Sequence, residues 1–174
     1  MGKVIAQHQQ RTPSPFNGPV EIGLRALAIL NDAYPSALSL QRLVVFDYLL
    51  VHSDDIPGGP IGLHPQTPHR SGELLVRRSM LEDGLLLFLS RGLIDRHYTE
   101  HGVLFSATDR SAGFLDVLSS EYLAHLRERA AWLVTEFGGL TDNEITQLAE
   151  KHVGEWGAEF EMESVLNVQE ASWQ

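Results

Sequence analysis

The stretch SGELLVRRSMLEDGLLLFLSRGLIDRHYTEHGVLFSA, residues 71–107, decides the fold. Its first half predicts a helix, because Ser71 can cap the N-terminus, apolar residues recur every three or four positions, and Gly92 supplies a stop. Two short runs that favour strands follow, residues 93–99 and 103–107, joined by Glu100-His101-Gly102. Since the glycine of this linker can adopt a positive φ, we expect a β-hairpin.

Two further helices are expected before this stretch. Asn17 or Gly18 can cap a helix that has Pro19 at its first position, and Tyr34-Pro35 ends it. Ser39 can cap a second helix that is apolar on nearly all sides, so we expect this helix at the centre of the fold. Three helices followed by a hairpin are the order of a winged-helix domain.

The predicted fold class is therefore mainly α with a small β-hairpin (α+β), in which a winged-helix core precedes a long helix and a short helical and acidic C-terminal extension. The expected divisions are a flexible N-terminus (1–15), a winged-helix domain with a long Pro/Gly loop at 53–70 (16–108), a helical extension (109–152) and an acidic tail (153–174). In the extension, residues 109–137 predict one long amphipathic helix. Thr141 and Glu144 form a capping box that begins a short helix after it.

Composition narrows the class of protein further. The 174 residues are 43% hydrophobic and 21% charged, as in an ordinary folded domain. The formal net charge is -10, but from Glu136 onward there are nine acidic residues against one basic residue, so most of the acidity lies there. There is no cysteine and no long apolar run, and we expect a cytoplasmic protein without disulfides or thiolate metal sites.

Several groups of residues have side chains that could serve in catalysis or metal binding. The spacing of His52, Asp54, Asp55, His64 and His69 matches no compact set of metal ligands, and a polar loop explains these residues equally well. Arg91 and His97 have the spacing of a motif found in small helical ribonucleases, but Gly92 interrupts the helix that this motif needs. No phosphate-binding glycine loop or nucleophile elbow is present. We therefore expect no enzyme, no cofactor and no metal site.

The basic residues of the hairpin region are candidates for DNA contact. Arg70, Arg77 and Arg78 lie at the start and in the first half of the helix that would be the recognition helix, and Arg96 lies in the wing strand. Between residues 70 and 110, however, six basic residues are matched by six acidic ones. Ion pairs of Arg77 and Arg78 with Glu73, Glu82 or Asp83 on their own helix are an equally good explanation.

A series of short motifs in order resembles a known family, the middle component of bacterial ABC-three-component systems, over about residues 15–133. The motifs are Pro15-Phe16-Asn17, Leu24-Arg25-Ala26-Leu27, Tyr34-Pro35, Ser39-Leu40-Gln41-Arg42-Leu43, Phe46-Asp47-Tyr48, Leu63-His64-Pro65 and Arg70-Ser71-Gly72-Glu73-Leu74. In that family the middle protein is encoded between an SMC/Rad50-like ABC ATPase and a third, effector-like component. Lamassu-type antiviral defence is a known relative of these systems. The resemblance implies a role and partners, and it brings no catalytic residues with it.

Two functions are expected on this basis. The first is a non-enzymatic winged-helix adaptor that links an SMC/Rad50-like ABC ATPase to the effector-like protein by protein–protein interaction, with DNA reached through the complex and no membrane involved. The alternative is a dimeric winged-helix transcription regulator that pairs through residues 109–137 and binds DNA directly. The candidate residues for binding a partner or DNA are Arg42, His64, Arg70, Arg77, Arg78 and Arg96.

Overall fold

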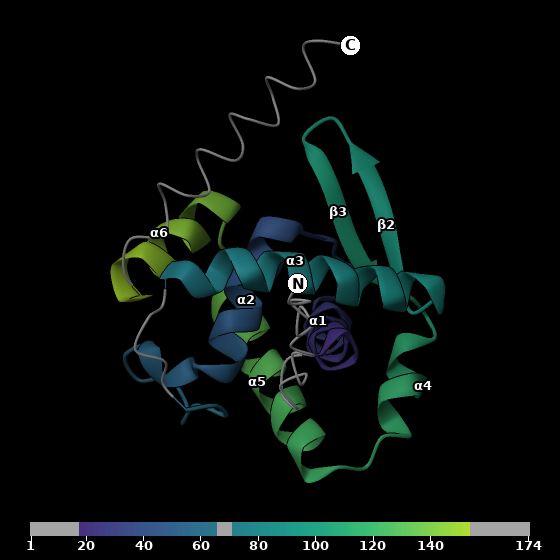
Figure 1. Cartoon of the computed structure of the whole chain (residues 1–174), viewed down its shortest axis with the longest axis horizontal. Coiled ribbons are helices and arrows are strands. Elements are labelled where there is room, and N and C mark those ends of the chain that lie inside the picture. Colours follow the sequence, from purple (N-terminus) through teal and green to yellow (C-terminus); the bar gives the residue numbers. More distant parts are fainter. Residues whose placement is uncertain (1–17, 66–70, 154–174) are drawn as a thin grey trace, which may run out of the picture.

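A computed structural model describes residues 18–65 and 71–153 of the chain, and the side chains of residues 76–152 within the second range. The described elements are mainly helical, with one small antiparallel sheet, as the sequence predicts (Figure 1). Their order is α1 (Pro19–Ala33), β1 (Leu38–Ser39), α2 (Leu40–Val51), the 3-10 helix η1 (Ser53–Asp55), α3 (Ser71–Ser90), β2 (Ile94–Thr99), β3 (Gly102–Ala107), α4 (Ser111–Asp116), α5 (Glu121–Phe137) and α6 (Asp142–Val153).

Short-range capping begins three of the helices as predicted. Gly18 is the N-cap of α1, with proline in the first turn. The Ser39 hydroxyl accepts a hydrogen bond from the backbone N–H of Arg42 at the start of α2 (3.1 Å). In the capping box of α6, the Thr141 N–H donates to the Glu144 carboxylate (2.7 Å), and the Glu144 N–H donates to the Thr141 hydroxyl (3.3 Å). The Thr141 hydroxyl also donates to this carboxylate (2.8 Å), and the two hydrogen bonds from Thr141 hold the pKa of the Glu144 carboxyl below its usual value.

The predicted hairpin is present, and it belongs to a three-stranded sheet in the order β1-β3-β2. Gly92 ends α3 with a φ of 67°, and Gly102 follows the hairpin turn with a φ of 122°, so both glycines serve as the sequence predicts. The strand β1 was not predicted, because two residues carry too little periodicity to be recognised. Leu38 pairs with Phe105 and Ser39 with Leu104, which fixes the base of the hairpin to the start of α2.

The prediction of one continuous helix over residues 109–137 is wrong. The segment forms two helices, α4 and α5, that are separated at residues 117–120 (Figure 1). The Ser120 hydroxyl accepts a hydrogen bond from the Leu123 N–H (3.2 Å) and so starts a new helix. Serine competes well as an N-cap, and here this local bond prevails over the apolar periodicity that runs through both helices.

The described part of the long loop is hydrogen-bonded to the helices. The backbone N–H groups of Leu63 and His64 both donate to the Val51 carbonyl (2.8 and 3.0 Å), at the end of α2. The Arg129 guanidinium of α5 donates to the Ile61 carbonyl (2.9 Å). His69 and Arg70 lie outside the described residues.

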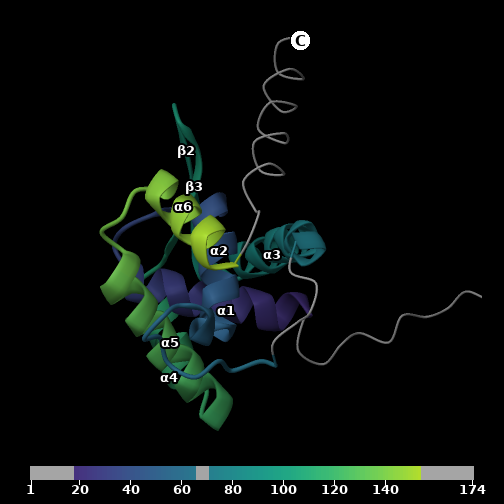
Figure 2. The same cartoon turned by 90° about the vertical axis from the view of Figure 1, so that its left-hand side faces the viewer.

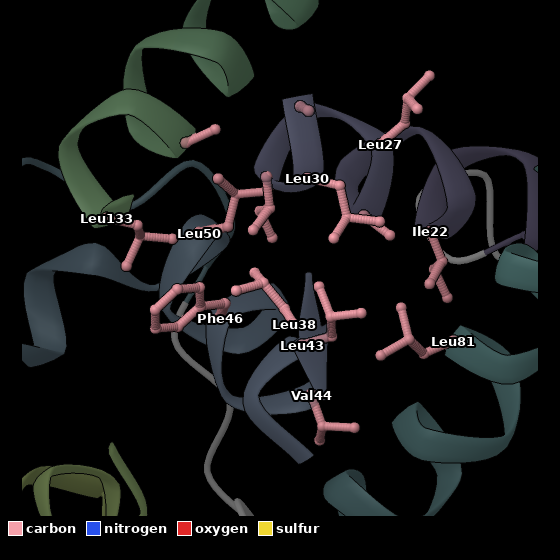
Figure 3. Packing of buried hydrophobic residues seen from close by; sticks show 14 of the residues in the cluster. Ile22, Leu27, Leu30, Leu38, Leu43, Val44, Phe46, Leu50, Leu81 and Leu133 are labelled. Carbon is pink, nitrogen blue, oxygen red and sulfur yellow. The ribbon is translucent and has the colours of Figure 1, made fainter. Parts of the chain in front are cut away.

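One hydrophobic core joins all of the main helices. Figure 3 shows Leu30 of α1, Leu43 and Phe46 of α2, Leu81 of α3 and Leu133 of α5 pointing into one region. Nearly the whole of α2 is buried, which confirms its predicted central place. Leu126 and Leu133 of α5 and Ala149 of α6 belong to the same cluster, so residues 109–152 contribute to this core.

The helices α1 and α3 cross with their backbones close together. A Cβ atom added at Gly84 would lie 2.7 Å from the Gly23 nitrogen and 3.0 Å from the Pro19 carbonyl oxygen, and neither backbone atom can move aside easily. A Cβ atom added at Gly113 in α4 would meet nothing within 4 Å. The α1–α3 crossing therefore requires glycine at position 84.

We predict that Gly84→Ala lowers the free energy of unfolding by about 1 to 3 kcal/mol, because it forces α1 and α3 apart. Gly113→Ala is the matched control and should raise it by about 0.5 to 1 kcal/mol, since alanine is the better helix former. Urea unfolding followed by circular dichroism measures both. Equal effects of the two substitutions would show that the crossing is not as close as described.

Candidate functional site

Three charged side chains meet between α1, α2 and α3. The Arg25 guanidinium donates through Nε to Oδ1 of Asp47 (2.6 Å) and through Nη2 to Oδ2 (2.9 Å), which is a bidentate pair. Arg77 of α3 donates through Nη1 to the same Oδ2 (3.3 Å). Arg25 is 0% exposed, Asp47 2% and Arg77 7%. These residues form the buried charge network of the protein.

The helical positions of these residues explain why they meet. Asp47 lies one turn from Leu43 and from Val51, so it is on a buried face of α2. Arg77 lies one turn before Leu81, on the face of α3 that packs on the core. Burying a charge without a partner costs several kcal/mol, so these positions tolerate charge only when opposite charges face each other.

A second group of polar side chains extends the network to α5 and the loop. The Tyr122 hydroxyl donates to Oε1 of Glu21 (2.9 Å) and lies 2.8 Å from Nε2 of His64. Because the only hydroxyl hydrogen of Tyr122 goes to Glu21, the His64 ring must donate from Nε2. Glu21 also lies 3.5 Å from Nη1 of Arg25, which joins this group to the first.

Burial shifts the ionisation of all three residues in this second group. Desolvation, together with the nearby Arg25 charge, lowers the pKa of His64 to about 4, so its imidazole is neutral at pH 7. Desolvation raises the pKa of Glu21, although the Tyr122 hydrogen bond partly offsets it, and desolvation also raises the pKa of the Tyr122 hydroxyl. Burial opposes the charge on Arg25, yet the contact with Asp47 leaves the pKa of Arg25 above its usual value.

The buried network contains charges of both signs. Two carboxylates, Glu21 and Asp47, face two guanidinium groups, Arg25 and Arg77, so the four formal charges cancel. Among the residues that the structure describes, no three His, Asp or Glu side chains are grouped so as to hold a metal ion. The arrangement is suited to fixing helices and the loop in place.

Arg42, predicted as a partner contact, lies at the junction of α2 with the turn between α5 and α6. Its Nε donates to Oδ1 of Asp142 (2.7 Å), Nη1 donates to the Gly138 carbonyl (3.3 Å), and Nη2 donates to the Leu140 carbonyl. The guanidinium therefore satisfies carbonyl groups at the C-terminal end of α5 and the acidic first residue of α6.

The other predicted site residues are spread over several places. His64 and Arg77 belong to the buried network described above. Arg78 lies 3.7 Å from Glu82 one turn later on α3, as the pairing along that helix predicts. Arg96 lies on β2, where its guanidinium packs over the Tyr98 ring (5.1 Å), and Arg70 is outside the described residues. The predicted candidates thus form no single site in the described parts of the chain.

The two residues of the ribonuclease-like motif have different surroundings. Arg91 is exposed just after α3, and Nε2 of His97 lies 2.8 Å from the Ser106 hydroxyl on the neighbouring strand. The central residues that the sequence analysis did not select are Arg25, Asp47, Glu21 and Tyr122. Asp47 carries the clearest sequence evidence, because it is the one charged residue in the apolar run from Leu43 to Val51.

An apolar hollow of about 290 Å³ lies between α3 and the hairpin, on the outer side of the sheet. We call it the α3–hairpin hollow. Leu86, on the exposed side of α3, is 54% exposed, and Val103 on β3 is partly exposed. The residues that line the hollow are Leu40, Glu82, Leu85, Leu86, Arg96, Val103 and Phe105. Figure 2 shows the hairpin projecting beyond the helices.

Comparison with known proteins identifies the family. The sequence model of the family described as ABC-three component (ABC-3C) system Middle Component 2 matches residues 15–159, which is most of the chain. The chain belongs to this family. As a Middle Component 2 protein it acts with the other components of an ABC-three-component system, as the resemblance in the sequence implied. No curated protein and no solved structure gave a significant match.

In the described parts of this Middle Component 2 protein, none of the helices is long and apolar enough to cross a membrane.

We predict that Asp47→Ala lowers the free energy of unfolding by about 3 to 5 kcal/mol, because it removes the buried carboxylate that Arg25 and Arg77 share. Asp116→Ala removes an exposed pair with Arg127 and is the control, with an expected loss below about 1 kcal/mol. Thermal and urea unfolding measure the difference. Losses of the same size in both variants would contradict the role given to the buried network.

The shifted pKa of His64 predicts how stability depends on pH. The unfolded chain protonates this ring near pH 6.5 and the folded chain only near pH 4, so between these values the unfolded state binds more protons. The free energy of unfolding should therefore fall as the pH falls through this range, by about 1 to 2 kcal/mol after allowance for solvent at the ring. The raised pKa of Glu21 acts in the opposite direction and remains in the variant.

His64→Gln should remove most of this fall, whereas His101→Gln, in the exposed hairpin turn, should keep it. Urea unfolding at pH 4.5, 5.5 and 6.5 provides the comparison. If the wild type and His64→Gln lose stability in parallel, the imidazole is not held neutral by its burial.

Proposed function

We propose that this Middle Component 2 protein is a non-enzymatic winged-helix adaptor that links an SMC/Rad50-like ABC ATPase to an effector-like protein in a Lamassu-like antiviral defence complex in the cytoplasm. ATP hydrolysis and the effector chemistry then belong to the partners. The family membership supports action within a three-component system. The choice of an adaptor depends on which side chains the fold turns inward and which it presents at the surface.

The order of the elements supports the winged-helix assignment. The sequence of elements α1, β1, α2, α3, β2 and β3, with the sheet in the order β1-β3-β2, is the arrangement of a winged helix in which β2 and β3 form the wing. In such a domain α3 corresponds to the recognition helix. The face formed by α3 and the hairpin is therefore the one to compare with a DNA-binding surface.

The observation that carries the proposal is the chemistry of this face. The exposed positions along the described side chains of α3 include Ser79, Glu82, Asp83 and Leu86, and Arg78 is close to Glu82. Arg77 faces Asp47 in the interior. The described side chains of this face, from residue 76 onward, include no basic stripe of the kind that phosphate contacts require, whereas an apolar hollow with polar edges suits a protein partner.

The interior also supports a role without catalysis. Several of the described groups with shifted pKa values are paired inside the chain. Arg25 is buried against Asp47, and the partly buried Tyr122 donates to Glu21. A catalytic acid or base needs access to its substrate. The buried network is better suited to holding the binding face in a fixed shape.

The alternative function, a dimeric DNA-binding regulator, has less support. It assigns dimerisation to residues 109–137, but the apolar stripe of α5 is used inside the chain, where Leu123, Leu126, Ala130 and Leu133 are buried. Its DNA contacts include Arg77, which is buried. Arg78 and Arg96 remain its accessible candidates.

The test is co-expression with the ATPase encoded beside this chain, followed by size-exclusion chromatography with light scattering. We expect a stable complex for the wild type. Leu86→Glu should weaken the complex at least about tenfold, because it places a charge in the apolar hollow. Val117→Glu is the matched control, since Val117 is also an exposed aliphatic residue but lies between α4 and α5, and it should leave binding unchanged.

A different result of the same experiment would contradict the adaptor proposal. If the chain runs alone as a dimer and shifts duplex DNA, and if Arg78→Ala with Arg96→Ala abolishes that shift, the protein is a DNA-binding regulator and the adaptor proposal is wrong.

A further inference from the structure

A second apolar hollow, of about 400 Å³, lies on the other side of α3, where the start of α1, the end of α3 and α4 come together. We call it the α4 hollow. Figure 1 shows α4 below the end of α3 and away from α6. Phe88 and Phe114 pack edge to face there, with ring centres 6.1 Å apart. The residues that line this hollow are Val20, Leu87, Phe88, Leu93 and Phe114, with Arg91 and Arg110.

The two arginines of the α4 hollow place positive charge at its rim. Nη1 of Arg110 donates to the Arg91 carbonyl (3.3 Å), and both side chains are exposed. In the described ranges 18–65 and 71–153, neither guanidinium is in an ion pair. Of the neighbouring carboxylates, Asp109 accepts a hydrogen bond from the Tyr34 hydroxyl (2.8 Å) and Asp116 pairs with Arg127 (2.9 Å).

This combination specifies the chemistry of an occupant. The apolar lining suits an aromatic or large aliphatic side chain, and the two guanidinium groups suit carboxylates beside it. Val20, at 64% exposed, adds apolar surface to the same rim. The α3–hairpin hollow differs in this respect, since Glu82 stands with Arg96 among its lining residues and reduces its attraction for an acidic segment.

One segment of this chain has that chemistry. Residues 154–174 contain five glutamates and no basic residue, together with Trp156, Phe160 and Trp173. Twenty-one residues can span up to about 70 Å when extended. A folded unit of this size has a radius of gyration of roughly 14 Å, so the segment is long enough to reach any part of the surface from the end of α6.

We propose that residues 154–174 bind intramolecularly at the α4 hollow, with an aromatic side chain on the apolar lining and glutamates beside Arg91 and Arg110. This inference does not depend on the adaptor function. An acidic segment of another protein would have to displace these residues to bind the hollow.

Cross-linking tests the location directly, because the chain has no cysteine of its own. A variant with Val20→Cys and Ser164→Cys, treated with a short bismaleimide, should give an intramolecular product of monomer mass. A variant with Tyr98→Cys and Ser164→Cys is the matched control, since Tyr98 is exposed on the hairpin. Its yield should be at least about tenfold lower if the segment is held at the α4 hollow.

Limited proteolysis tests the role of charge. Chymotrypsin cleavage after Trp156 and Phe160 in the full chain should be about tenfold faster in Arg91→Glu with Arg110→Glu than in the wild type, and high salt should accelerate cleavage of the wild type. Arg96→Glu, the same charge reversal on the hairpin, should not change the rate. If the double reversal lowers the melting temperature, Arg91→Gln with Arg110→Gln replaces it.

Three results would overturn the proposal. The first is equal cross-linking yield from Val20→Cys and Tyr98→Cys. The second is cross-linked product at dimer mass only, which would place the segment of one chain on a second copy. The third is cleavage that is insensitive to Arg91 and Arg110 but slowed by a partner protein, which would show that the segment binds elsewhere.

Discussion

The ion pair between Arg25 and Asp47 is the interaction on which the rest of the structure depends. It lies between α1 and α2 and is fully removed from water, so both helices must be placed for two hydrogen bonds to form at once. Arg77 adds α3 to the same carboxylate. Through Glu21, Tyr122 and His64 the network also reaches α5 and the loop. The relative positions of four helices therefore depend on one group of charges of both signs. Apolar packing alone would fix these positions less uniquely.

Because some basic side chains are used in the interior, fewer of them remain at the surface to bind DNA or a partner. Arg42 caps the turn between α5 and α6, and Arg77 is internal, so two of the basic residues that would favour DNA serve the fold instead. The face formed by α3 and the hairpin is left with Leu86, Val103 and the acidic residues of α3. A rigid scaffold that presents an apolar hollow is what a component acting through other proteins requires, in keeping with membership of the Middle Component 2 family.

Local rules in the sequence predicted the helices, their caps and the hairpin, because each depends on residues a few positions apart. Gly92 and Gly102 have the positive φ values expected of them, and the Thr141–Glu144 box forms as predicted. The break before α5 was missed because the Ser120 cap lies within a continuous apolar stripe. The buried network was missed for a different reason. Arg25, Asp47 and Arg77 are far apart in the chain, and only the packing of three helices shows that they share one partner, although a single aspartate within an apolar helix was evidence of a buried contact.

Whether the face formed by α3 and the hairpin binds a protein partner can be measured by hydrogen exchange with mass spectrometry. The chain is compared alone and assembled with the ABC ATPase of its system. We expect added protection over residues 76–90 of α3 and over the hairpin, 94–107, with α1 and α2 equally protected in both states. Duplex DNA added to the chain alone should change nothing on this face. Protection of the face by DNA alone, or an assembled complex that leaves α3 and the hairpin as exposed as before, would contradict this expectation.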